Sequence, residues 1–336
     1  MGAVLLIVTA FVVGGAPREP ESVAHVRAYF TAIHEGRVAD ALALAGVRRP
    51  SGDEARFLTR KALTGGWKIV ALRESAHYDG FSSDPEEATV EIAIRTGGTT
   101  AVSALTLLKA DGEWRIEDPL VEVTFPKTNM LYVDVNGVRA PTDLTADRSV
   151  YALLPGGYRF YTDVPGVAKV ASKLAPVLPS QARVSLDLAP GVALTRKGEQ
   201  AARAALKTYL DACARSAELT PKGCPFGADR GIGPQGEEYR SVSDFREVTW
   251  EIQRYPKVAV VPNGLRLADR QRGSVRVTVT ATEDESKKVR YSVTCEMRMN
   301  GYSLAIKPDG TLKVLSQYAR VADRDDDYGL RVTSCG

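Results

Sequence analysis

The chain has 336 residues, of which 44% are apolar and 25% are charged, and 44 Lys and Arg against 41 Asp and Glu give a net charge of +3. This composition is that of a globular protein, so it excludes a wholly disordered chain, a collagen-like chain and a polytopic membrane protein. The near balance of charge argues against a nucleic-acid-binding surface, which needs clustered Lys and Arg. At about 150 residues per domain, the length predicts two or three domains.

The chain begins with an uncharged apolar run, residues 1–16. A signal-peptide core has about 7–15 apolar residues and a spanning helix about 20, so the length favours a signal peptide. The flanking residues do not fit a signal peptide. No basic residue precedes Ala3, and cleavage after Ala16 would leave Pro17 as the first residue of the mature chain. We therefore favour a membrane anchor at residues 1–18, with the body outside the cytoplasm, or secreted if the segment is cleaved. A buried N-terminal strand or helix is the alternative.

The cysteines lie in the last third of the chain: Cys213, Cys224, Cys295 and Cys335. An even number in an exported chain is typical of disulfides, and the intervals lack the paired Cys-x2-Cys spacing of a zinc site. Cys213 closes the apolar stripe of a predicted helix and Cys224 follows a turn, so these two should pair across a short loop. Cys295, on the apolar side of a strand, should then pair with Cys335. Free structural thiols would be the alternative in a cytosolic protein.

The first predicted domain, residues 19–125, begins with helices. The apolar residues of the opening helix recur at helical spacing: Val23, Val26, Phe30 and Ile33. A second short helix is expected over 39–45, and a capping box of Ser51 and Glu54 predicts a third. After Gly66 the period changes to two. This predicts strands over 67–78, 86–95, 101–109 and 114–117, the last two joined by the turn Asp111-Gly112.

Helices followed by a curled antiparallel sheet resemble the nuclear transport factor 2-like cone fold. The resemblance rests on the opening helix with Val23, Val26 and Phe30, the short helix at 39–42 and the closing strand 112–116. It covers about a third of the chain and is one of pattern rather than motif. It implies an α+β cone but no particular activity, because this fold hosts enzymes, transport factors and inert modules alike.

The second predicted domain, residues 126–192, consists mostly of short strands. Alternating residues lead up to the turn Asn136-Gly137, and further strands are expected on both sides of the turn 155–157 and over 184–188. The one helix signal lies at 167–175. Together these features predict a small β-sandwich.

The segments 133–138 and 153–158 resemble the small modules of TcaA-like envelope proteins. Those proteins pair such sandwiches with cone-fold domains behind one membrane helix. The resemblance implies a role in sensing or tolerating wall stress.

The third predicted domain, residues 193–336, opens with a long Ala-rich helix whose apolar stripe includes Leu206, Leu210 and Cys213. Alternating apolar residues then predict strands over 248–252, 275–279, 289–299, 302–306 and 312–314, the last two joined by a turn at 308–310. A helix followed by a meander predicts a second cone-like domain. The fold class of the whole chain is thus α+β.

Residues that could carry out chemistry are few. His25 and His34 are nine residues apart on one helix, which places them on opposite faces, so they cannot share a metal ion. If the first domain were catalytic, the one set that could carry out acid–base chemistry would be Tyr29, His77 and Asp118. A surface strand position is the preferred interpretation of His77.

Two other sequence patterns do not predict a binding site. The glycine-rich segment 231–236 lacks the Lys-Ser/Thr of a phosphate-binding loop. The acidic run Asp323, Asp325, Asp326 and Asp327 lacks the spacing and the glycine of a calcium loop. The sequence therefore predicts no catalytic residues, no metal site and no cofactor.

Two classes of function remain. We favour a membrane-anchored extracytoplasmic binding or scaffolding protein of the cell envelope, without catalysis, whose partner is an envelope protein or a cell-wall ligand and not nucleic acid. The alternative is a cone-fold enzyme acting on a small hydrophobic molecule. A deep pocket in the first domain lined by Tyr29 and His77 would favour the enzyme, whereas an interior filled with aliphatic side chains would favour the binding protein.

Overall fold

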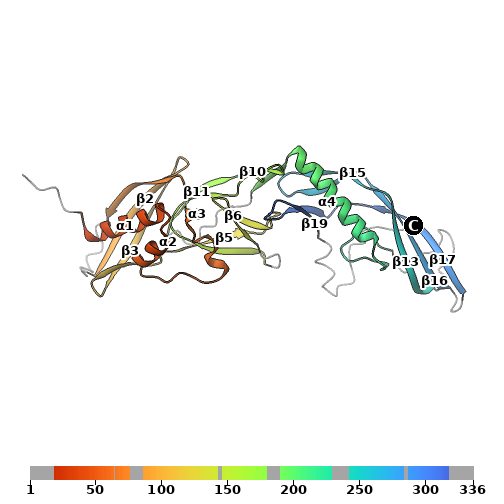
Figure 1. The fold of residues 1–336 in the computed structure, drawn as a ribbon, viewed down its shortest axis with the longest axis horizontal. Helices are drawn as coiled ribbons and strands as arrows, with labels where there is room; N and C mark the ends of the chain where they lie inside the picture. The colour runs from red at the N-terminus through yellow and green to blue at the C-terminus, as the bar shows by residue number, and fades with distance from the viewer. Residues whose placement is uncertain are drawn as a thin grey trace, which may run out of the picture. The chain divides into compact units, whose positions relative to one another are not determined.

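The computed structural model describes residues 19–63, 65–75, 86–142, 146–179, 190–228, 242–283 and 287–317. This part of the protein has few helices and many antiparallel strands in several sheets, which confirms a strand-rich α+β class (Figure 1). None of its helices is long and apolar enough to cross a membrane. The predicted anchor at residues 1–18 lies outside the described residues.

The chain forms two compact units. The first comprises residues 1–121, 152–157 and 176–182, and the second comprises 122–151, 158–175 and 183–336. The finer division into domains at residues 19–125, 126–192 and 193–336 stays a prediction.

In the first unit, helices pack on one face of an antiparallel sheet (Figure 1). The helices are α1 (Glu21–His34), α2 (Val38–Leu44), the 3₁₀ helix η1 (Asp53–Phe57) and α3 (Arg60–Leu63). The strands are β1 (Trp67–Glu74), β2 (Glu87–Thr96), β3 (Thr99–Ala110) and β4 (Glu113–Ile116), hydrogen-bonded in chain order. The predicted stripe of α1 is buried, because Val26, Phe30 and Ile33 are fully covered. Asp111 and Gly112, at φ 54° and 80°, form the predicted hairpin turn.

The capping box predicted at Ser51 is wrong. The helix that follows is a 3₁₀ turn beginning at Asp53, and no side chain caps it. Gly52 occupies the N-cap position at φ 75°, in the left-handed region that glycine reaches without strain. Ser51 therefore lies one residue too early for its hydroxyl to serve as the cap.

Small sheets follow along the chain. The strands are β5 (Val121–Pro126), β6 (Tyr132–Val135), β7 (Val138–Pro141), β8 (Arg148–Leu153), β9 (Gly156–Phe160), β10 (Ala168–Ala171), β11 (Lys173–Val177) and β12 (Gly191–Leu194). They form a sheet of order β11-β9-β6-β7 and the pairs β5-β8 and β10-β12. The helix expected at 167–175 is wrong, since pairing of β10 with β12 prevails over the helical propensity of its alanines. The strand expected at 184–188 lies outside the described residues.

A buried carboxylate holds the predicted Asn136-Gly137 turn between β6 and β7. Asp134 is fully buried, and its Oδ1 accepts a hydrogen bond from the Gly137 amide at 2.8 Å. Its Oδ2 accepts from Thr162 Oγ1 at 2.7 Å and lies 3.5 Å from Arg139 Nε. Because each carboxylate oxygen has a donor, the charge is tolerated in the interior. The hairpin is thereby joined to the segment that follows β9.

The C-terminal part of the second unit contains the predicted long helix and two antiparallel sheets. The elements are α4 (Arg196–Ala214), β13 (Val242–Arg254), β14 (Lys257–Val261), β15 (Arg266–Gln271), β16 (Gly273–Glu283), β17 (Lys287–Met297), β18 (Tyr302–Ile306) and β19 (Leu312–Ser316). The sheets have the orders β13-β16-β17 and β14-β15-β18-β19. The strands predicted in this region are confirmed, whereas β14 and β15 were not anticipated.

Strand β13 is irregular. Its pairing with β16 shifts register between Ser243 and Arg246 and again between Arg246 and Thr249. Asp244 and Glu247, beside these shifts, have positive φ values of 50° and 52°. A third shift lies between Ile252 and Arg254, so the strand is irregular at three points.

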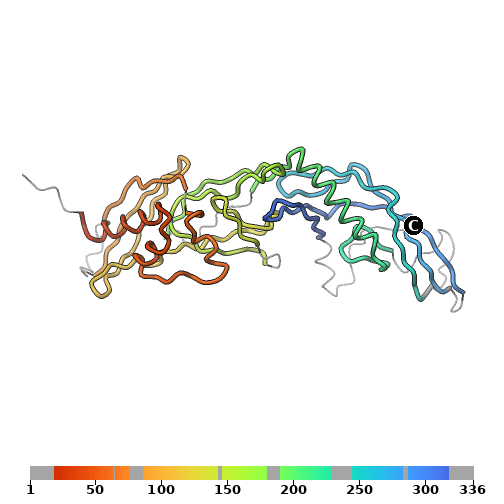
Figure 2. Tube along the Cα trace, viewed as in Figure 1, coloured from red at the N-terminus to blue at the C-terminus, as the bar shows by residue number. Residues whose placement is uncertain are grey.

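A linker, residues 127–131, is joined to β18 within the second unit. Met130 forms a parallel bridge with Ile306, and the Leu131 amide donates to the Ile306 carbonyl at 2.8 Å. Figure 2 shows the yellow trace of this linker beside the dark blue trace of β18. The Asn129 side chain completes the junction, because its Nδ2 donates to the Leu304 carbonyl at 2.7 Å and also to the Gly264 carbonyl.

Replacing Asn129 with alanine should lower the free energy of local unfolding around β18 by about 2 kcal/mol, because two main-chain carbonyls lose their donor. Asn129→Asp should cost at least as much, since the carboxylate keeps the shape of the side chain and cannot donate. Hydrogen exchange of the Leu131 and Ile306 amides, followed by mass spectrometry, measures the loss.

Gln317→Ala is the matched control. Gln317 is an exposed residue at the end of β19, so its substitution should change exchange by less than about 0.5 kcal/mol. Wild-type exchange in Asn129→Ala would contradict the assigned role.

Candidate functional site

Two of the three residues nominated for catalysis, Tyr29 and Asp118, lie in the described part of the structure. Tyr29 is fully buried, and its hydroxyl donates to the Pro119 carbonyl at 2.7 Å. Asp118 is exposed, at a positive φ of 47°. His77 lies outside the described residues. The set Tyr29, His77 and Asp118 therefore stays a prediction.

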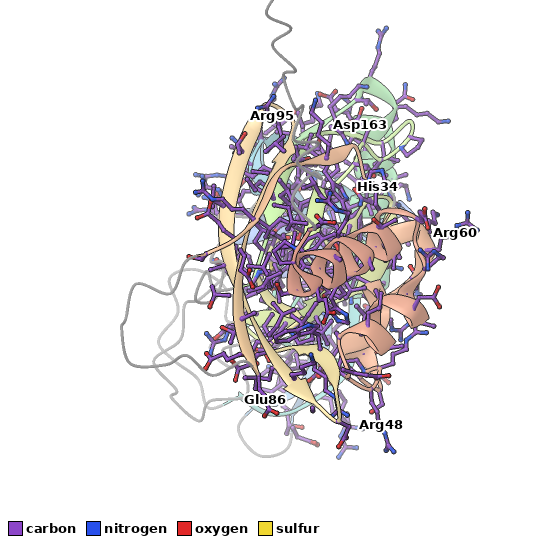
Figure 3. The ribbon with its side chains drawn as sticks, turned by 90° about the vertical axis from the view of Figure 1, so that its left-hand side faces the viewer. His34, Arg48, Arg60, Glu86, Arg95 and Asp163 are labelled. Carbon is purple, nitrogen blue, oxygen red and sulfur yellow. A yellow bond between two sulfur atoms is a disulfide. The ribbon has the colours of Figure 1, made fainter. Side chains whose placement is uncertain are left out.

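The interior of the first unit is filled by packed apolar side chains. Residues buried to 1% exposure or less come from α1 and from both central strands: Ile33, Val90, Ile92, Ile94, Leu105 and Leu107. Edge-to-face ring contacts, Tyr29 to Phe30 at 5.3 Å and Phe30 to Trp67 at 6.2 Å, extend this core. Charged side chains such as Arg48, Arg60 and Arg95 point outward, as Figure 3 shows.

The two histidines of α1 make separate contacts. His25 Nε2 lies 2.8 Å from the Leu44 carbonyl, at the end of α2. The His34 ring packs edge-to-face on Trp67 at 5.0 Å. Among the described residues, no cluster of three or more His, Cys, Asp or Glu side chains could hold a metal ion.

A groove of about 1050 Å³ lies in the second unit. Its lining comes from separate segments: the linker 127–131, the turn 261–264 with the start of β15, the turn 300–301 with the start of β18, and the end of β19. Val261 is paired with Arg266, Arg266 with Ser303, and Ser303 with Leu315, so these residues form a row across the β14-β15-β18-β19 sheet.

This row lies on the face of the sheet away from α4. The Tyr302 ring packs against Tyr209 of α4, with ring centroids 6.1 Å apart. Because successive side chains of a strand point to opposite faces, Ser303 and its cross-strand partners point away from the helix. The groove is therefore a sheet face bordered by the linker, rather than a cavity in the core.

The groove is polar and positively charged. Its charged lining residues are Lys127 and Arg266, and none of the described lining residues is acidic. Its neutral polar lining residues carry amides and hydroxyls: Thr128, Asn129, Asn263, Asn300, Ser303, Ser316 and Gln317. Such a lining favours a ligand with negative charge and many hydrogen-bonding groups.

The turn at the border of the groove has a strained backbone. Asn263 and Leu265 have positive φ values of 60° and 46°. Asparagine tolerates this region, but for a bulky leucine it is an uncommon and costly conformation. Leu265 is nearly fully buried, and its carbonyl accepts from the Leu304 amide at 2.8 Å. Packing and pairing thus hold Leu265 in place and fix Gly264 and Arg266 on either side of it.

Sequence reasoning missed this groove. No motif marks it, because its residues come from parts of the chain as far apart as Lys127 and Gln317. The one local signal was the turn Pro262-Asn263-Gly264, which is typical of a chain reversal between strands. That turn alone indicates a hairpin and not a binding surface.

The predicted bridge between Cys213 and Cys224 is confirmed. Their sulfurs are 2.03 Å apart and their Cα atoms 5.8 Å apart. The hydroxyls of Tyr209 and Tyr302 both donate to the Gly223 carbonyl beside the bridge, the second at 3.0 Å. Side chains from α4 and β18 therefore hold the loop that the disulfide closes.

The remaining sequence signals cannot be placed. Cys295 is buried on β17, and its predicted partner Cys335 lies outside the described residues, so their pairing stays a prediction. The glycine-rich segment 231–236 and the acidic run at 323–327 also lie outside the described residues.

Comparisons of the chain with protein-family models, with curated proteins and with solved structures give no match.

Two tyrosines, Tyr132 which is buried and Tyr209 which is half-buried, make the stability of the second unit depend on pH. Burial raises the pKa of Tyr132 to about 12, with Arg139 lowering it and Asp134 raising it to smaller extents. Burial likewise raises the pKa of Tyr209 to about 12. In the unfolded chain a tyrosine ionises near pH 10, so the unfolding free energy should fall as the pH rises from about 10 to about 12.

Tyr132→Phe should reduce this loss and should also raise the unfolding free energy at pH 7 by about 1 kcal/mol. The reason is that the buried Tyr132 hydroxyl has no hydrogen-bond partner among the described residues. Tyr209→Phe should reduce the alkaline loss too but lower stability at pH 7, since its hydroxyl is bonded to Gly223. Urea unfolding at pH 8 and pH 11 tests both variants, and an unchanged pH dependence in both would refute the assignment.

Proposed function

We propose that this protein is a membrane-anchored extracytoplasmic binding or scaffolding protein of the cell envelope that acts without catalysis. The observation that carries the proposal is the Cys213–Cys224 disulfide, because such bridges persist in oxidising compartments. The uncharged apolar run at residues 1–16 supports the same location.

The finer architecture belongs to this proposal. The order of α1 and α2 followed by the meander β1–β4 supports a cone of the nuclear transport factor 2-like type. The short strands β6 to β9 support a small sandwich, and α4 with the sheets that follow supports a second cone-like domain. Modules of this kind in series behind one membrane segment are the arrangement of TcaA-like proteins, which supports a role in wall-stress sensing.

The packing of the first unit supports a role without catalysis. A cone-fold enzyme needs an open interior in which a titratable group meets its substrate. Here aliphatic side chains fill the space between α1 and the sheet, and the Tyr29 hydroxyl is bonded to main chain. The groove of the second unit supports binding as the activity.

The topology is tested by adding protease to intact spheroplasts that express the full chain. We expect the body to be digested while a cytoplasmic control protein is spared. The same digestion after lysis should remove both proteins, which shows that the control is cleavable. Complete protection of the body before lysis would contradict the extracytoplasmic location.

The disulfide pattern is tested by peptide mapping of protein purified from the envelope, with free thiols blocked before lysis. We expect one peptide pair joining Cys213 to Cys224 and another joining Cys295 to Cys335. Loss of the first bridge, with a sequence separation of 11, should cost about 3 kcal/mol in the chain-entropy model. A Cys213→Ser, Cys224→Ser double variant measures that cost, and four blocked thiols in the wild type would contradict the compartment.

A further inference from the structure

We propose that the groove of the second unit binds an anionic glycan, meaning a sugar chain that carries carboxylate or phosphate groups. The inference rests on the proposed binding role and names the class of ligand.

The charge of the groove points to an anion. Arg266 is exposed at the start of β15, and no carboxylate of the described residues lies within salt-bridge distance of its guanidinium. The planar guanidinium presents paired donors that match carboxylate and phosphate oxygens. Lys127 adds a second positive charge from the linker, and the described lining offers no acidic side chain to repel an anion.

The neutral groups of the groove suit a polyhydroxylated ligand. Amide and hydroxyl side chains can each donate and accept, as sugar hydroxyls do. In one of these side chains, Asn129, the Nδ2 group already donates to the main-chain carbonyls of Gly264 and Leu304. Val261 and Leu315 lie at the two ends of the cross-strand row that contains Arg266 and Ser303, so apolar surface flanks the polar groups. Sugar rings likewise present both C–H and hydroxyl surfaces.

The state of the β18 edge argues against an extended acidic peptide. A peptide that joins a sheet needs free main-chain donors and acceptors along an edge. On this side of β18, the Leu304 amide bonds to Leu265, the Leu304 carbonyl to Asn129, and the Ile306 amide to the Asn129 carbonyl. The edge is occupied, so a ligand in the groove is recognised through side chains.

The size of the groove indicates more than one sugar. Pockets for small molecules occupy about 300–1,000 Å³, and this open groove of about 1050 Å³ reaches the upper end of that range. An oligomer with several negative charges can place one of them at Arg266 and extend along the groove.

The test uses the full chain in detergent micelles and isothermal titration calorimetry with defined probes. An oligogalacturonate supplies carboxylates, a phosphorylated dextran supplies phosphates, neutral dextran is the uncharged control, and poly-L-glutamate is the acidic peptide. We expect at least one of the anionic glycans to bind more tightly than neutral dextran and poly-L-glutamate, with affinity that falls as salt rises. The better anionic probe identifies which charged group is recognised.

Variants locate the site. Arg266→Gln should weaken binding at least tenfold, and Lys127→Gln should weaken it severalfold. Arg266→Lys should restore part of the affinity, which separates loss of charge from loss of folding. Arg203→Gln is the matched control, because Arg203 is an exposed arginine of α4 on the other side of the sheet, and it should bind as the wild type does.

Three results would overturn the proposal: no binding of either anionic glycan, equal binding of poly-L-glutamate, or unchanged affinity in Arg266→Gln. The spheroplast experiment is independent of these measurements. A body outside the cytoplasm combined with any of the three results would refute the ligand class and leave the proposed function standing.

Discussion

The hydrogen bonds of one asparagine side chain hold together the part of the protein that contains the groove. β15 pairs with β18 only near Ser303, and the linker takes its place along β18 at Ile306. Between them the Leu304 carbonyl would be buried without a donor, and Asn129 Nδ2 supplies it. The same nitrogen reaches Gly264, so the turn, the strand and the linker are fixed relative to one another. The floor and the border of the groove depend on this junction.

Polar side chains also supply hydrogen bonds to main-chain groups elsewhere in the second unit, at places where regular strand pairing ends. Asp134 satisfies the Gly137 amide of the tight turn and is itself satisfied by Thr162. Tyr209 and Tyr302 bond to the Gly223 carbonyl beside the disulfide. Each arrangement obeys the requirement that buried polar atoms find partners. Because side chains satisfy the main-chain groups that lack a partner at strand ends, a unit built of many short strands can still form a stable interior.

Sequence patterns predicted those features that depend on neighbouring residues. The stripe of α1, the Asn136-Gly137 turn and the Cys213–Cys224 bridge all depend on residues within a few turns or one short loop. Strand β15 was missed because the charged segment Arg266–Gln271 lacks the alternation typical of a strand, and β14, its hairpin partner, was missed with it. The groove was missed because tertiary pairing brings its residues together. The sequence also could not show that the Tyr29 hydroxyl is buried and bonded to main chain.

The bulges of β13 affect whether a second copy of the protein could pair along this strand. In the described part of its sheet, β13 is an outer strand, and a long regular outer strand is a template on which another chain can add. Asp244 and Glu247 break the even spacing of main-chain donors and acceptors and place carboxylates beside each break. A strand from a second copy would lose register with β13 within a few residues. The irregularity therefore disfavours edge-to-edge pairing along this strand.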